Sequence, residues 1–210
     1  MNSDGSAVRR LISLSGLALG PGLYADNPRM PAWSPDGRYI AFAIDYCCDE
    51  IFTYVRMIDS SGKLVSFPQP NAVYFPVGEP AWSPSGADIA YIGGYPRNGS
   101  RWPPPWTAGA LLTVDLNGRV TRLHQYCDFD YCSLTFPRYT YVDRPAWSAD
   151  GAALAFTSSV QSSPWARYPH PLSIHLVSRE GGAPRLLLEN ASEPAFSPDG
   201  MRIAFVRRPG

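Results

Sequence analysis

Large apolar residues alternate with smaller or polar ones along several short stretches of the chain. In the clearest stretch, Ile40 and Phe42 lie on one side of an extended segment and Ala41 lies on the other. The same alternation recurs at 89–91, 154–156 and 203–205. A period of two is typical of β-strands that bury one face in a sheet. The pattern therefore predicts an all-β protein.

A turn sequence precedes each alternating stretch, and the two together recur four times. The copies read PAWSPDGRYIAFA from Pro31, PAWSPSGADIAYI from Pro80, PAWSADGAALAFT from Pro145 and PAFSPDGMRIAFV from Pro194. A type I turn followed by a left-handed glycine makes a tight hairpin. We expect a strand on each side of the turn, with the Trp or Phe of each copy filling an equivalent space between sheets. We refer to this repeated sequence as the box.

A second, weaker repeat lies between the copies of the box. Strand–turn–strand patterns with a glycine in the turn cover 1–12, 57–67, 113–123 and 176–188. Four antiparallel strands per repeat are typical of a β-propeller blade. We therefore expect a single propeller domain over 1–210, with four-stranded blades at about 29–68, 79–125 and 144–189 and a partial blade made of 193–208 plus 1–14.

The box and the hairpin that follows it resemble the TolB-like, WD40-like (PD40-type) β-propeller repeat. The resemblance covers nearly the whole chain. It implies a propeller, and the family's propellers serve as periplasmic protein-interaction modules, as lids on prolyl-oligopeptidase-type hydrolases and in some sugar-processing enzymes.

The last blade is incomplete in this interpretation. Residues 7–14 would supply its fourth strand and 194–208 its first two, so the third strand is absent. The chain is then either a fragment of a larger propeller or a small ring or open arc. An open arc exposes unpaired strand edges, which favour self-association.

Charge and composition narrow the range of partners. The 18 basic and 18 acidic residues give no net charge, which argues against nucleic acid and anionic membranes. We expect no membrane insertion, because the chain has no run of 18 apolar residues. The apolar segment 11–23 lacks a cleavage site, so we expect no signal peptide in the chain as given.

Long intervals between predicted strands would all leave the sheets on the side opposite the tight turns, and function tends to lie on such loops. They are rich in aromatic residues, which suit recognition of a protein, a peptide or a glycan. Alternatively, the rings pack beneath their own loops. The candidate binding residues are Tyr95, Trp102, Trp106, Tyr126, Phe129, Tyr131, Trp165 and Tyr168.

The same intervals hold all four cysteines, Cys47, Cys48, Cys127 and Cys132. An even number in clustered loops is typical of disulfides and of an oxidising compartment, although free thiols or a metal remain alternatives. We therefore predict a periplasmic or secreted protein, and otherwise a cytoplasmic one.

Glu79, Arg144 and Glu193 occupy equivalent positions just before the proline of the box. We expect them at the mouth of the propeller channel, either ion-paired with one another or available to a ligand.

Catalytic signatures are absent from the sequence: there is no GxSxG elbow, no HExxH and no glycine-rich phosphate loop. The histidines are scattered along the chain, and we expect His175 to be a packed side chain. We predict no catalytic residue, no metal and no cofactor.

The sequence thus favours a non-catalytic binding propeller that uses its aromatic loops. The alternatives are the regulatory propeller of a prolyl-oligopeptidase-type hydrolase whose catalytic domain lies outside this chain and, third, a sugar-lyase-like enzyme with metal-bound histidine.

Overall fold

The computed structural model describes residues 6, 8–13, 24–47, 52–65, 79–96, 107–125, 139–161 and 172–207. Within these ranges the chain forms thirteen β-strands and no helix. The strands make four antiparallel sheets, which we number in chain order.

The first sheet contains β1 (Tyr24–Trp33), β2 (Tyr39–Cys47) and β3 (Phe52–Asp59). The second contains β4 (Ala81–Trp82), β5 (Asp88–Pro96), β6 (Thr107–Asp115) and β7 (Val120–Gln125). The third contains β8 (Tyr139–Trp147), β9 (Ala153–Gln161), β10 (Ser173–Ser178) and β11 (Arg185–Glu189). The fourth has only β12 (Ser192–Phe196) and β13 (Ile203–Val206).

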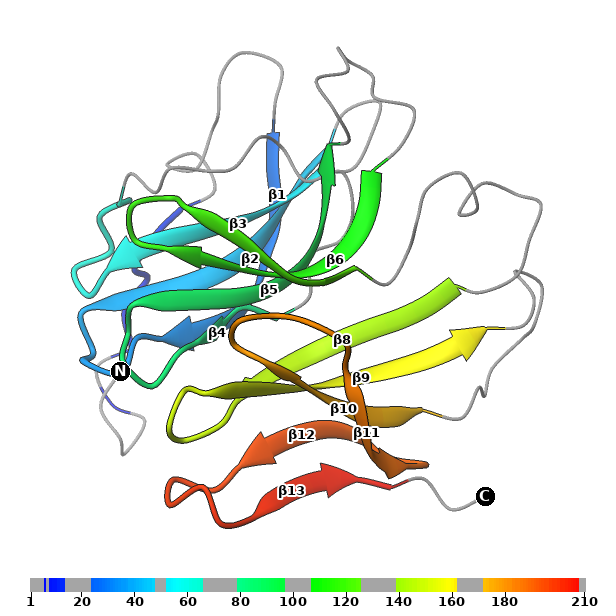
Figure 1. Ribbon diagram of the computed structural model, residues 1–210. Coiled ribbons are helices and arrows are strands. Elements are labelled where there is room, and N and C mark those ends of the chain that lie inside the picture. Colours follow the sequence, from blue (N-terminus) through cyan, green and yellow to red (C-terminus); the bar gives the residue numbers. More distant parts are fainter. Residues whose placement is uncertain are drawn as a thin grey trace.

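The sheets stack face to face in chain order, with the first and fourth at opposite ends of the stack (Figure 1). Strand β4 contacts both β1 and β8, and β12 contacts β8 and β9. Each sheet runs its strands sequentially from the box outward, as a propeller blade does. The predicted all-β architecture of antiparallel blades with an incomplete last one is therefore confirmed.

The turn of the box has the predicted geometry. Gly37 donates its backbone N–H to the Ser34 carbonyl at 2.9 Å, and the Ser34 hydroxyl accepts from the Tyr39 N–H at 2.9 Å. The same hydroxyl donates to Asp36 at 2.6 Å and lowers the pKa of that carboxyl. The four turn glycines adopt nearly the same left-handed φ: Gly37 69°, Gly86 71°, Gly151 70° and Gly200 71°. Glycine takes this conformation without steric cost.

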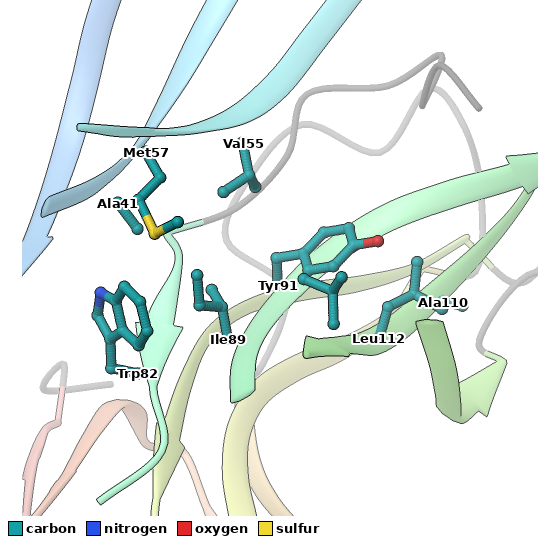
Figure 2. Close-up of a cluster of buried hydrophobic side chains, with 9 residues drawn as sticks. Ala41, Val55, Met57, Trp82, Ile89, Tyr91, Ala110 and Leu112 are labelled. Atoms are coloured by element: carbon teal, nitrogen blue, oxygen red, sulfur yellow. The ribbon is translucent and has the colours of Figure 1, made fainter. Parts of the chain in front are cut away.

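The hydrophobic core lies between successive sheets. At the first junction, Trp82, Ile89 and Tyr91 of the second sheet face Ala41, Val55 and Met57 of the first (Figure 2). At the second junction, Trp147, Leu154 and Phe156 of the third sheet meet Ala90, Ile92 and Leu111 of the second. The third junction is smaller and includes Ala155, Ile174, Ala191 and the partly buried Phe196. The large and small residues of each alternating stretch thus face opposite neighbours.

The tryptophans of the box do not all have equivalent surroundings. Trp82 and Trp147 are 9% and 7% exposed, whereas Trp33 is 56% exposed. The expectation that Trp33 fills a space between sheets is therefore wrong. The reason is its position: Trp33 is on the free face of the first sheet, against which no other described sheet packs.

The N-terminal segment 8–13 lies against this free face. Leu11 and Ile12 pack on a cluster formed by Ile40, Phe42, Ile44 and Ile58. Arg9 donates to the Ser60 carbonyl at 3.1 Å. Residues 8–13 belong to no strand in the structure, so their pairing with 193–208 in one blade stays a prediction.

Candidate functional site

Most of the predicted aromatic binding residues lie outside the described residues. Tyr95 is in β5, where its backbone pairs with Ala108 of β6. Cys47 ends β2, paired with Tyr24. The remaining predicted residues of these two sets fall outside the described ranges: Trp102, Trp106, Tyr126, Phe129, Tyr131, Trp165, Tyr168, Cys48, Cys127 and Cys132. Their binding and disulfide roles stay predictions.

The strand ends next to these intervals share one side of the molecule. Pro96 pairs with Thr107 at one such end of the second sheet, and Gln161 pairs with Tyr139 at the corresponding end of the third. The tight turns lie along the opposite edge, on the left in Figure 1. The predicted separation of tight turns from long intervals is thus present in the sheets.

The structure brings together the three charged residues predicted at the channel mouth. Arg144 Nη1 lies 2.9 Å from Glu79 Oε1, and Arg144 Nε lies 3.8 Å from Glu193 Oε1. These side chains come from three different repeats, which places an ion-paired cluster across the inner strands. All three are 35–47% exposed, so the pairs contribute little to stability. A ligand role for them stays a prediction.

A repeated backbone distortion occurs at two of these residues, Arg144 and Glu193, and at the equivalent Met30. Met30, Arg144 and Glu193 adopt left-handed φ values of 57°, 52° and 58°, each just before the proline of the box. Each coincides with a register shift in the first strand of its sheet. Such strain costs on the order of 1–3 kcal/mol per residue and persists where neighbouring structure holds it. Glu193 is held by its N–H, which donates to the buried Thr157 hydroxyl at 2.9 Å.

Two histidines that are far apart in the sequence meet across the second junction. His124 of β7 and His175 of β10 both stack on Phe156, with ring centroids 6.3 and 5.9 Å from the phenyl centroid. His175 Nδ1 lies 2.8 Å from the hydroxyl of Ser158, which is 5% exposed. The expectation of a packed His175 agrees with these contacts. His124 contacts the same phenyl ring, and His170 lies outside the described residues.

Burial sets the titration of both rings. Desolvation lowers the pKa of His124, and the nearby charge of His175 lowers it further. Desolvation also lowers the pKa of His175, against a backbone hydrogen bond that raises it. Both rings are therefore neutral near pH 7. The Ser158–His175 pair sits between two sheets, so it has the chemistry of a structural hydrogen bond more than that of an accessible nucleophile. His124 lies in the fourth strand of the second sheet and His175 in the third strand of the third sheet, so no equivalence within the repeat would have paired them.

An open depression of about 620 Å³ lies on the tight-turn side of the first sheet. It is lined by residues of two turns, including Arg38, Tyr39, Asp59, Lys63 and Val65. The sequence predicted only tight turns on this side of the sheets, and it gave no indication of a depression between them.

Two further properties apply to the described residues. No cluster of three or more His, Cys, Asp or Glu side chains is placed to hold a metal ion. No helix among them has the length and hydropathy needed to cross a membrane.

Comparison with known proteins supports the fold. No family model matches the chain, and no curated protein matches it. A prolyl endopeptidase structure is similar to 89% of this chain, with a TM-score of 0.52 and 17% identity. Kuenenia stuttgartiensis hydrazine synthase is similar to 87% of the chain, with a TM-score of 0.51 and 19% identity.

The chain spans only part of these proteins, 25% of the first and 59% of the second. A putative TolB from Agrobacterium tumefaciens also matches over 87% of this chain and 91% of its own, at 16% identity and with a TM-score of only 0.35. Identities this low show the fold alone. The structural similarity to prolyl endopeptidase and the four stacked sheets together establish an incomplete β-propeller.

Proposed function

We propose that this chain is a non-catalytic binding propeller that recognises a protein, a peptide or a glycan through its aromatic-rich intervals. One observation carries the proposal: the strand ends next to those intervals share one side of a rigid stack of sheets. Binding residues are commonly loop residues held by such a scaffold. The intervals contain Trp102, Trp106 and Trp165, a residue type enriched at binding hot spots.

The ion-paired cluster of Glu79, Arg144 and Glu193 supports the same proposal in a secondary way. Its charged groups come from three blades and remain partly exposed, so a polar ligand group at the channel mouth could exchange for one of the pairs. The four cysteines favour an exported, periplasmic or secreted location for this activity.

The test uses arrays of 15-residue peptides, proline-rich sequences included, and an array of glycans as probes. We expect at least one probe to bind the unmodified chain, and the double variant Trp102→Ala/Trp106→Ala to bind it about tenfold more weakly or less. Leu116→Ala is the matched control, because Leu116 is an exposed apolar residue on the tight-turn side. Equal binding by the double variant and the unmodified chain, or no bound probe in either array, would overturn the proposal.

The second candidate is the regulatory propeller of a prolyl-oligopeptidase-type hydrolase. The fold similarity to one quarter of a prolyl endopeptidase is the observation that favours it. The coding sequence on either side of this segment decides between the two. A continuation into an α/β-hydrolase segment with a nucleophile elbow would support the hydrolase.

A further inference from the structure

The junctions between sheets repeat a specific contact. Trp82 donates its indole N–H to the Ala32 carbonyl of the preceding sheet at 3.0 Å. Trp147 donates in the same way to the Ala81 carbonyl at 3.0 Å. In both junctions, the acceptor of the indole N–H is thus the alanine carbonyl of the previous copy of the box, in the preceding sheet.

The turns repeat a second contact at each junction. A Cβ placed on Gly86 would lie 3.7 Å from Cδ of Pro35, and one on Gly151 would lie 3.7 Å from Cδ of Pro84. The turn of each box thus packs on the second turn residue of the preceding box. These two contacts define what one blade of this chain requires of the blade before it.

The free face of the first sheet carries the tryptophan and the turn glycine of these two contacts, without the alanine carbonyl and the turn residue of a preceding sheet in the described part of the chain. Trp33 is 56% exposed, and no hydrogen bond involves its indole N–H among the described residues. Among the described residues, no heavy atom beyond those of its chain neighbours lies within 4 Å of a Cβ placed on Gly37. Leu11 and Ile12 cover β2 and β3 of this face and leave Trp33, at the end of β1, open. We call this surface the leading face.

The free face of the fourth sheet carries the complementary groups, which are the alanine of the box and the second turn residue. Ala195 pairs with Ala204 in the same register as Ala32 with Ala41 and Ala81 with Ala90. Ala41 and Ala90 are fully buried beneath the next tryptophan, whereas Ala195 and Ala204 are exposed. Pro198 is the equivalent of Pro35 and Pro84, on which the following turns pack, and like them it is exposed. We call this surface the trailing face.

We infer that two copies of this chain assemble head to tail, with Trp33 on the leading face of each packed against the trailing face of the other. Trp33 would donate to the Ala195 carbonyl, and the turn at Gly37 would pack on Pro198. Segment 8–13 already covers the outer strands of the first sheet and leaves only the inner part of the leading face open. The fourth sheet has two strands, which suits this narrower surface.

The number of copies follows from the sheets. A head-to-tail contact produces either a closed ring or an open filament. Each copy has four described sheets, so two copies make eight, within the usual range of about four to eight blades, and three copies exceed it. A closed pair therefore fits best. This inference does not depend on the ligand proposed above, so either can fail without the other.

Sedimentation equilibrium over about 1–200 µM protein tests the assembly. We expect the unmodified chain to reach twice its monomer mass of 23.1 kDa. Trp33→Ala should weaken association about 100-fold or more, as loss of a central tryptophan does at interfaces, and Trp33→Phe should weaken it about two- to tenfold by removing the N–H. Leu116→Arg is the control and should associate normally, because Leu116 is exposed on the tight-turn side.

A mixing experiment tests the head-to-tail geometry. Ala204→Arg alters only the trailing face, and we expect it to be monomeric like Trp33→Ala. A mixture of the two variants has one intact leading face and one intact trailing face, so it should form a mixed dimer. The inference is overturned by a wild-type chain that stays monomeric over the whole range, by association that Ala204→Arg leaves unchanged, or by two monomeric variants that fail to complement. Circular dichroism of each variant confirms that the exposed substitutions leave the sheets folded.

Discussion

Trp33 and Trp82 occupy the same position of the same repeated box, yet one is exposed and the other is buried. Trp82 stacks on Tyr39 with ring centroids 6.5 Å apart and bonds to the Ala32 carbonyl, both in the preceding sheet. Trp33 has the same turn and the same strand register but no preceding sheet among the described residues. The box therefore determines its own hairpin, whereas the burial of its tryptophan depends on the neighbouring repeat.

The largest expected effect comes from removing these side chains one at a time. Trp82→Ala and Trp147→Ala should each reduce the free energy of unfolding by about 3–5 kcal/mol, because each leaves a cavity between two sheets. Trp33→Ala should cost less than about 1 kcal/mol, since most of the side chain is already in water. Urea denaturation in the Ala204→Arg background, which we expect to be monomeric, measures all three. A loss for Trp33→Ala equal to that for Trp82→Ala would contradict the difference between the two positions.

A smaller effect distinguishes the second junction from the first. The second junction contains His124 and His175, and both have a pKa lowered from 6.5 mainly by burial. The unfolded chain then binds protons more readily than the folded one as pH falls through about 6.5. Stability should be fully present above that pH and should decline progressively toward pH 5.

The comparison for this pH dependence is the double variant His124→Gln/His175→Gln. Urea midpoints measured between pH 7.5 and 5 should fall for the unmodified chain and stay nearly flat for the variant, which still contains His170. Carboxyl groups such as Asp36 and Asp150 have pKa values lowered from 3.8 by serine hydroxyls, so their contribution persists above about pH 4 and is lost only below it. Parallel curves for the two proteins above pH 5 would rule out the histidine pair as the source.

The sequence predicts the repeated parts of this fold well because their causes are local. The proline, serine and glycine of each turn set its conformation, and the alternation after Ile40 or Ile89 assigns each side chain to a face. The incomplete fourth sheet follows from the same count of strands. The exposure of Trp33 could not be predicted, because it depends on whether another sheet packs against the first one.

Contacts among the candidate site residues were predictable only where the residues occupy equivalent positions in the repeat. The meeting of Glu79, Arg144 and Glu193 follows from their equivalent positions in the repeat. The His124–Phe156–His175 stack joins unequal strands of different blades, and no local pattern encodes it. The left-handed backbone at Arg144 and Glu193 is also a product of packing, since the residue before a proline ordinarily favours extended conformations.

Hydrogen exchange of the indole N–H groups tests most directly whether the box tryptophans join successive sheets. The measurement uses ¹⁵N-labelled Ala204→Arg, to prevent association, with each indole signal assigned by a single Trp→Phe substitution. The N–H groups of Trp82 and Trp147 should exchange slowly, and that of Trp33 should exchange rapidly. Rapid exchange at Trp82 and Trp147, at the rate of Trp33, would mean that these rings do not pack between blades.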